Sequence, residues 1–249
     1  MEPIERFSNR VENYRRYRPS YPAAVIDLIR DTAGLRSGAS VADIGSGTGI
    51  LTRLLLDAGW EVHAVEPNAP MRHAAEEDLG ASPRFHSVDA SAEATRLSPA
   101  SLDAIACAQA FHWFDHDAAQ AEFTRILKPE GWAFMIWNER QMGGAFDLAY
   151  HEILASLGHA FEGVRDRAEN KQLDNFFRAG TYRTAQFPNP TRMDWPALRG
   201  RFLSSSYVPA EGDPRLPSLL AQLESIYREH QHDGYVVHDQ TANVYFGQL

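Results

Sequence analysis

Residues 41–49 of the chain read VADIGSGTG, an apolar run that enters a loop with glycine at every second position. An apolar helical pattern follows over residues 50–58, and Gly59 stands where such a helix would end. A second apolar run, Val62 to Val65, then leads directly to Glu66. The pattern predicts the first β-α-β unit of a doubly wound α/β sheet, with a ligand held where the first strand turns into the helix.

The loop and the acidic residue together favour a nucleoside ligand over a chance glycine turn. Glycine at positions 45, 47 and 49 allows positive φ and a close approach of the backbone to the ligand. Glu66, at the end of the second strand, can accept hydrogen bonds from the two hydroxyls of a ribose.

The glycine spacing narrows the choice of nucleoside. The dinucleotide fingerprint is G-x-G-x-x-G, whereas this loop reads G-x-G-x-G with Asp43 two residues before the first glycine. A pyrophosphate favours a helix N-terminus without a negative charge nearby. A ligand with an amino-acid end carries an ammonium group instead, which Asp43 could help to hold.

A third and a fourth strand are expected after Glu66. A helix over residues 69–78, capped by Asn68, precedes a strand over residues 84–88 that ends at Asp89. Residues 91–93 resemble the start of a helix, and residues 102–108 form an apolar strand typical of the centre of a parallel sheet. Asp89 is either a helix cap or a group that faces the same crevice as Glu66.

The loop after the fourth strand carries His112 and Trp113, at the edge where a doubly wound sheet faces its ligands. These two side chains either pack internally or form a substrate-facing histidine and an aromatic wall. Asp115 is expected to cap a helix through Leu127. Residues 127–131 then read as a turn before a fifth strand, residues 132–137.

Residues 43–49, the acidic Glu66 and Asp89, and the Leu-Lys-Pro-Glu-Gly sequence at 127–131 resemble the class I S-adenosylmethionine (SAM) methyltransferases, with Glu130 in place of a glycine. The Tyr-Arg-Pro-Ser-Tyr-Pro arm at 17–22 and the His-Trp-Phe-Asp loop at 112–115 resemble the trans-aconitate methyltransferase-like (methyltransferase type 11) subgroup. Members of that subgroup methylate small carboxylates. The resemblance implies a Rossmann-like sheet of seven strands, mostly parallel with an antiparallel closing strand, with helices on both faces and an extra helical cap.

The resemblance also implies roles for individual residues. The expected cofactor contacts are Asp43, Gly45, Ser46, Gly47, Glu66, Pro67, Met71, Asp89, Ala90, Gln109 and Arg18. The expected substrate contacts are Tyr14, Tyr17, Tyr21, His112 and Trp113. His112 is the candidate catalytic residue: it would act as the base for a hydroxyl or amine acceptor, and would position a carboxylate, which is already ionised at pH 7. No metal is expected.

The chain is expected to form a single methyltransferase domain, residues 1–249. Residues 1–22 form an arm that either anchors the chain or closes over the ligand, and a helix from Pro22 to Thr32 precedes the SAM-binding core at 33–140. Helical cap insertions follow at 141–235, with helices expected over 146–157, 169–179, 195–203 and 215–230 and a sixth strand over 182–187. Residues 236–249 contain the closing strand. The cap also contains Arg192, Arg199 and Arg201, which either bind an anionic substrate or form a solvated face.

Composition limits the other possibilities. The net charge of the 249 residues is −9, which disfavours a nucleic-acid partner. A single cysteine excludes an internal disulfide, and no apolar stretch reaches the ~20 residues of a membrane span. We therefore expect a cytoplasmic monomer or homodimer that uses SAM to methylate a small molecule, with a carboxylate as one candidate acceptor. The alternatives are a SAM-binding protein without transferase activity and an NAD-dependent oxidoreductase.

Overall fold

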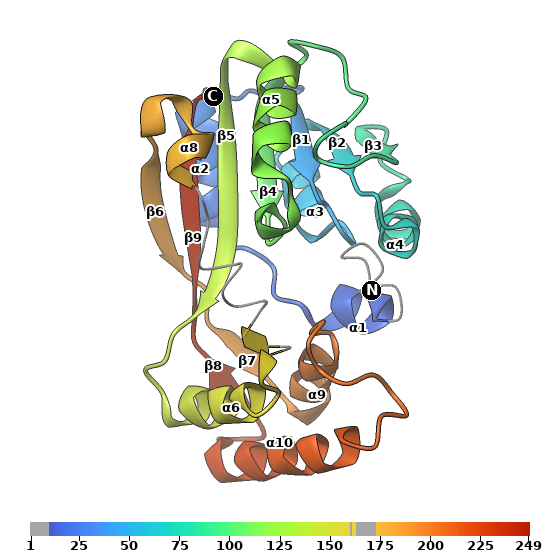
Figure 1. Cartoon of the computed structure of the whole chain (residues 1–249), viewed down its shortest axis with the longest axis vertical. Helices are drawn as coiled ribbons and strands as arrows, with labels where there is room; N and C mark the ends of the chain where they lie inside the picture. Colours follow the sequence, from blue (N-terminus) through green and yellow to red (C-terminus); the bar gives the residue numbers. More distant parts are fainter. Residues whose placement is uncertain (1–9, 160, 163–172) are drawn as a thin grey trace.

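The computed structural model of the chain describes residues 10–159, 161–162 and 173–249 (Figure 1). Its main feature is a seven-stranded sheet in the order β3-β2-β1-β4-β5-β9-β6. The strands are β1 (Ser40–Ile44), β2 (Glu61–Val65), β3 (Phe85–Val88), β4 (Leu102–Ala108), β5 (Leu127–Arg140), β6 (Arg183–Pro188) and β9 (Gln240–Gly247). β1 to β5 pair in parallel, and β9 runs antiparallel to both of its neighbours. The Rossmann-like sheet and its antiparallel closing strand are therefore confirmed.

Helices cover both faces of the sheet because its strands bury apolar side chains on both sides. The helices are α2 (Ala23–Ala33), α3 (Ile50–Asp57), α4 (Ala69–Leu79), α5 (His116–Ile126) and α8 (Leu173–Phe176). Buried residues of α2 and α3 pack with one set of strand residues, and those of α5 and α8 with the opposite set. In β9, Val244 lies with the first set and Tyr245 with the second, as its alternation predicts.

A second apolar core lies below the sheet in Figure 1. It is built from α6 (Ala145–Ala155), α9 (Trp195–Leu203), α10 (Leu216–His230) and a two-stranded sheet of β7 (Thr191–Met193) and β8 (Val236–His238). The expected cap is thus mainly helical, but it also contains this small sheet, which the sequence analysis did not include.

The described part of the N-terminal arm forms a helix, α1 (Val11–Tyr17), between the sheet and the cap (Figure 1). α1 contacts α9 of the cap and α4 of the core. Gly200 on α9 permits this approach, since a Cβ there would lie 2.0 Å from Cδ2 of Tyr17. On the other side, Arg15 donates to Asp78 of α4 through Nε at 2.7 Å.

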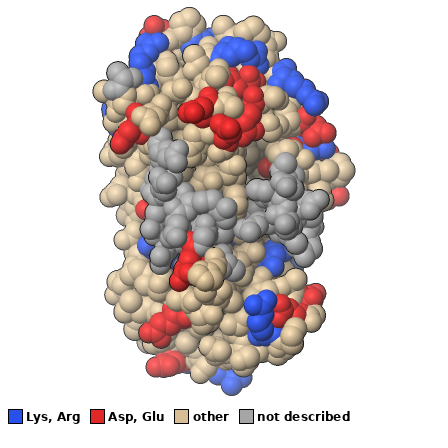
Figure 2. All heavy atoms as spheres, viewed as in Figure 1, with Lys and Arg blue, Asp and Glu red and all other residues tan. Residues whose placement is uncertain are grey.

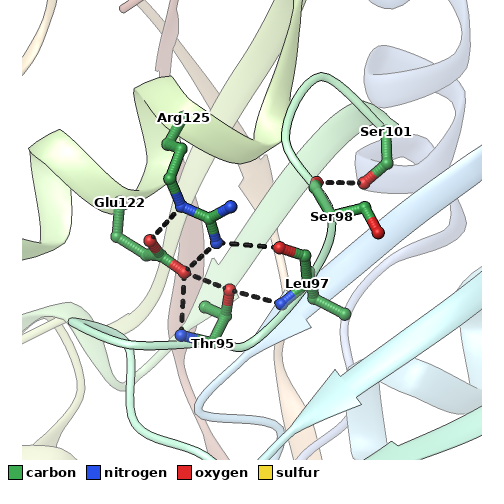
Figure 3. A network of polar contacts seen from close by, with 6 residues as sticks. All are labelled: Thr95, Leu97, Ser98, Ser101, Glu122 and Arg125. Atoms are coloured by element: carbon green, nitrogen blue, oxygen red, sulfur yellow. Dashed lines mark hydrogen bonds and ion pairs between the residues drawn. The ribbon is translucent and has the colours of Figure 1, made fainter.

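Two expectations for the core were wrong. No helix begins at residues 91–93; the segment between β3 and β4 is a loop that hydrogen bonds secure to α5 (Figure 3). Glu122 of α5 accepts from the Thr95 backbone N–H at 2.8 Å, and Arg125 donates to Glu122 and to the Leu97 carbonyl. These bonds satisfy backbone groups that a helix would have paired internally.

Residues 127–131 were expected to form a turn, but they belong to β5. Leu127 pairs with Leu102, and pairing with β4 resumes only between Ala104 and Trp132, so the residues between form an irregularity within a continuous strand. The helix expected over 169–179 falls partly outside the described residues; within them, α8 ends at Phe176 and a 3-10 turn follows at Arg178–Gly180.

Candidate functional site

The glycine loop lies at the carboxyl end of β1, next to the point where the strand order reverses between β1 and β4. This is where doubly wound sheets bind ligands. Gly45, Gly47 and Gly49 have φ of +71°, +56° and +82°. A Cβ at Gly45 would meet Ala110 at 2.4 Å, whereas one at Gly47 would meet nothing within 4 Å. Gly45 is therefore required by packing, while the backbone at Gly47 borders open space.

Glu66 is held against this loop from the end of β2. Its Oε2 accepts from the Gly47 N–H and its Oε1 from the Asn68 N–H, each at 2.8 Å. Burial raises the pKa of this carboxyl, and the two N–H donors oppose that effect. Each oxygen retains acceptor capacity, so the carboxylate can still accept from two ligand hydroxyls.

Asp43 lies behind the loop and is only 1% exposed. Its Oδ2 accepts from the Thr52 hydroxyl at 2.6 Å, while its buried Oδ1 has no hydrogen-bond partner. Burial raises the pKa of Asp43 to about 7, and the nearby Glu66 carboxylate adds to the shift. The end of β1 behind the loop therefore contains an unsatisfied acceptor that a cationic or donor group would stabilise. The hydroxyl of Thr48 in the same loop is also buried without a partner.

The residues expected near an adenine lie on α4 and after β3. Arg72 donates to the Glu66 carbonyl at 2.9 Å and pairs with Asp89 at 3.0 Å. It thereby joins the ends of β2 and β3, although Asp89 itself remains largely exposed. Met71 is buried, and the N–H of Ala90 donates to the Val88 carbonyl.

The rim beyond β4 holds Gln109 and the 3-10 turn Phe111–Trp113. Gln109 has a φ of +57°, and its side chain donates to the Asn138 carbonyl at 3.0 Å, which ties the end of β4 to β5. The rings of His112 and Trp113 are half-buried with their centroids 4.9 Å apart.

The arm brings Arg18, Tyr14 and Tyr21 towards the same region. Arg18 lies over the Tyr14 ring at 4.8 Å. Burial raises the pKa of Tyr21 well above its usual value, and the charges of Tyr14 and Asp43 raise it further; the Tyr21 ring packs against the apolar core that α2 and α3 form with the sheet. Tyr17 differs from the other tyrosines because it packs against Gly200 of α9.

A pocket of about 400 Å³ lies beside the arm. Its lining comprises residues 16–21 of the arm, residues 189–193 and Ala197. Tyr17, Arg18, Tyr21 and Arg192 thus line one pocket, at the junction of the arm and the cap.

Other features of the described residues bear on the expected partners. Within 10–159, 161–162 and 173–249, no group of three or more His, Cys, Asp or Glu side chains is arranged to hold a metal ion. Among the same residues, no helix combines the length and apolarity needed to cross a bilayer. Figure 2 shows acidic and basic side chains interspersed over the described part of one face.

A methyltransferase domain model matches residues 42–135, which run from within β1, through the glycine loop, into β5. An uncharacterized methyltransferase of Geobacillus sp. is 33% identical over 177 residues, which are 66% of this chain and 81% of the relative. The chain belongs to the methyltransferases.

An uncharacterized methyltransferase of Mycobacterium tuberculosis is 37% identical over 163 residues, 65% of this chain and 62% of that protein. The chain thus spans less than two thirds of the length of that relative. The fold is also that of phosphoethanolamine N-methyltransferase 2 of Haemonchus contortus, solved with phosphomonomethylethanolamine and S-adenosylhomocysteine. That similarity has a TM-score of 0.59 at 15% identity and covers 98% of this chain and 58% of the other.

Sequence reasoning missed several polar residues of this methyltransferase-family chain. Arg72 comes directly after Met71, and no sequence motif marks it. Arg140 was overlooked although it ends β5 at the ligand-binding edge of the sheet. Tyr150 lies in the cap, on α6, where no motif marked it. Of the three arginines proposed for an anion, Arg192 and Arg199 are exposed, and Arg201 is buried.

Proposed function

We propose that the chain is a SAM-dependent methyltransferase that acts on a small molecule. One observation carries the proposal: the Glu66 carboxylate is held by the N–H groups of Gly47 and Asn68 beside the open face of a glycine loop, at the switch point of a Rossmann-like sheet. The family match covers the same loop. S-adenosyl-L-methionine is the cofactor of this family.

The residues present fit that cofactor. The space beside Gly47 accommodates a ligand against the backbone, and Glu66 is placed for ribose hydroxyls. The unpartnered Oδ1 of Asp43 suits the ammonium of an amino-acid end better than it suits a pyrophosphate. Asp89, together with Arg72, borders the side of the crevice assigned to adenine. Met71, Pro67, Ala90 and Gln109 are the other proposed contacts of the cofactor.

When bound, SAM supplies a methyl group on a sulfonium for in-line transfer to a nucleophile. The chain's own residues contribute alignment and exclusion of water. The arm serves both purposes in our proposal, because Ser20 is fixed to the core: its carbonyl accepts from Asn138 at 3.3 Å and from Asn189 at 2.9 Å. The arm around Ser20 is thereby held to the end of β5.

His112 is the proposed catalytic residue, with Trp113 as a wall of the acceptor site. A carboxylate acceptor, which the subgroup resemblance favours, needs no base, so His112 would orient it. A hydroxyl or amine acceptor would need His112 as the base. A His112→Ala variant with full turnover on its true acceptor would remove this residue from the mechanism.

Calorimetric titration of SAM, S-adenosylhomocysteine and NAD into wild type and Glu66→Ala tests the cofactor assignment. We expect the wild type to bind the first two ligands and the variant to bind them at least tenfold more weakly. NAD binding instead would favour an oxidoreductase and refute the proposal. SAM binding without transfer to any acceptor in a screen with labelled SAM would favour the second alternative, a SAM-binding protein without transferase activity.

A further inference from the structure

A cluster of arginine and tyrosine side chains lies where the arm, the end of β5 and the cap meet, and the family assignment does not explain it. We call it the arginine cluster, and its members are Arg18, Arg140, Tyr150, Arg201 and Tyr207. Arg201 is 8% exposed and Tyr150 is 2% exposed.

The contacts within the arginine cluster connect three elements. Arg201 on α9 donates to the Gln240 side chain at 3.0 Å, and Gln240 pairs directly with Arg140 across the β5–β9 ladder. Arg140 in turn donates to the Tyr207 hydroxyl and lies over the Tyr150 ring at 5.7 Å.

Arg18 joins the cluster from the arm. It donates to the Ser204 carbonyl at 3.2 Å, just after the last turn of α9 that carries Arg201. The Nε of Arg18 and the Nη1 of Arg201 are both buried without a hydrogen-bond partner. Two unsatisfied guanidinium donors therefore lie at the same junction.

The carboxylates nearest these cations do not form close ion pairs with them. In the described part of the chain, no ion pair joins Arg18, Arg140 or Arg201 to an acidic side chain within 4 Å. Asp147, the acidic group that acts on Arg140, is engaged by His238 Nδ1 and by the Asp239 N–H. Glu139, the residue before Arg140, accepts from the Asn243 side chain.

Neighbouring groups respond to the excess positive charge. Burial would raise the pKa of the Tyr207 phenol, but the charges of Arg140 and Arg18 lower it overall. Burial lowers the pKa of His238, and Arg201 and Arg140 lower it further. The pKa of Arg201 falls to about 10 through burial and repulsion by Arg18, so this residue still carries its charge at pH 7.

A buried cation without an ion-pair partner, such as Arg201, is unfavourable unless an anion completes the site, and the half-buried Arg18 and Arg140 add positive charge beside it. Guanidinium groups match carboxylate and phosphate oxygens, and tyrosine hydroxyls add neutral donors. We propose that the arginine cluster binds the anionic group, a carboxylate or a phosphate, of the methyl acceptor. This inference rests on the proposed function, because it identifies the second ligand of the same reaction.

The position of the cluster suits a group that approaches the cofactor crevice from the cap. Arg18 belongs to the arm whose Ser20 carbonyl accepts from the Asn138 side chain at 3.3 Å. Arg140 lies two residues beyond Asn138, whose carbonyl accepts from Gln109 at the rim of β4. An acceptor anchored at the arginine cluster would therefore extend its reactive end towards the crevice between β1 and β4.

The competing occupant is the carboxylate of SAM itself, since Arg18 was also a candidate cofactor contact. The two occupants are separated by titration of succinate, and separately of inorganic phosphate, into protein saturated with S-adenosylhomocysteine. A cluster that serves the acceptor still binds one of these anions, whereas a cluster filled by the cofactor carboxylate binds neither. The anion that binds more tightly distinguishes a carboxylate site from a phosphate site.

Substitutions then locate the binding. We expect Arg140→Gln and Arg201→Gln to weaken binding of the preferred anion at least tenfold, with S-adenosylhomocysteine affinity unchanged within twofold. Arg199→Gln is the matched control, because Arg199 lies two residues before Arg201 on α9 and is exposed; its anion affinity should match that of the wild type. Thermal unfolding shows whether Arg140→Gln is folded. If it is not, Arg140→Lys provides a second variant, because lysine retains the positive charge without the forked geometry of the guanidinium group.

Loss of anion binding on saturation with S-adenosylhomocysteine, or equal affinities in wild type and the two cluster variants, would overturn the inference while leaving the proposed function intact. Failure of the wild type to bind SAM or its product would instead refute the proposed function, and the anion titrations without cofactor would still test the cluster.

Discussion

Asp43→Asn should stabilise the ligand-free protein in a pH-dependent manner. Asp43 has a folded-state pKa of about 7 against an ordinary 3.8, mainly because of burial. A carboxyl whose pKa is raised by folding binds its proton more tightly in the folded state, so its ionisation destabilises the fold as the pH rises. With a shift of about three pKa units, ionisation of Asp43 lowers the free energy of unfolding by ~4 kcal/mol at pH 8 and by ~2 kcal/mol at pH 5. Asparagine has the same shape, can still accept from Thr52, and carries no charge.

Urea unfolding of wild type and Asp43→Asn at pH 5 and pH 8 measures this effect. The advantage of the variant should grow by about 2 kcal/mol between the two pH values. Asp31→Asn, at an exposed position on α2, is the control and should change stability equally at both. An Asp43→Asn variant whose stability relative to wild type does not depend on pH would refute the argument that Asp43 is a strained ionisable group. The same variant should bind SAM more weakly, because the proposed partner of the ammonium group is lost.

Four other substitutions test three separate parts of the structure. Gly45→Ala should cost about 3 kcal/mol in urea unfolding through positive φ and a 2.4 Å contact, whereas Gly47→Ala should cost about 1 kcal/mol and mainly reduce SAM affinity in calorimetry. Glu122→Gln should lower the free energy of unfolding by about 2 kcal/mol at pH 7, because Arg125 and Thr95 hold the pKa of Glu122 at about 2. The wild type should lose this advantage over the variant as the pH falls from about 4.5 to 2, and acid unfolding of the two proteins would detect the loss. Gly200→Ala should displace α1, and hydrogen exchange should then be faster over residues 11–18 than in wild type.

The core could be predicted from sequence because local and global patterns agree there. Residues 41–66 combine a strand-like run, a glycine loop, an apolar helix pattern and a second strand, and each follows from neighbours along the chain. The two errors concern segments whose structure depends on distant partners. Residues 91–93 have the composition of a helix start, but the backbone of their loop bonds to a carboxylate on α5. Residues 127–131 contain proline and glycine, yet β5 continues through them by a local irregularity.

The acceptor side could not be predicted in the same way because its residues come from distant parts of the chain. More than a hundred positions separate Arg18 from Arg140, and about sixty separate Arg140 from Arg201. No periodicity or motif relates the three residues. Only the packing of α1 on α9 and the pairing of β5 with β9 bring them together. The position of Arg140 at the end of a central strand was the one available signal, since side chains at that edge face the ligand crevice. The cofactor side is encoded by a contiguous loop, whereas the acceptor side arises from tertiary contacts between the arm and the cap. Changes in those contacting segments could therefore alter the acceptor while leaving the cofactor loop intact.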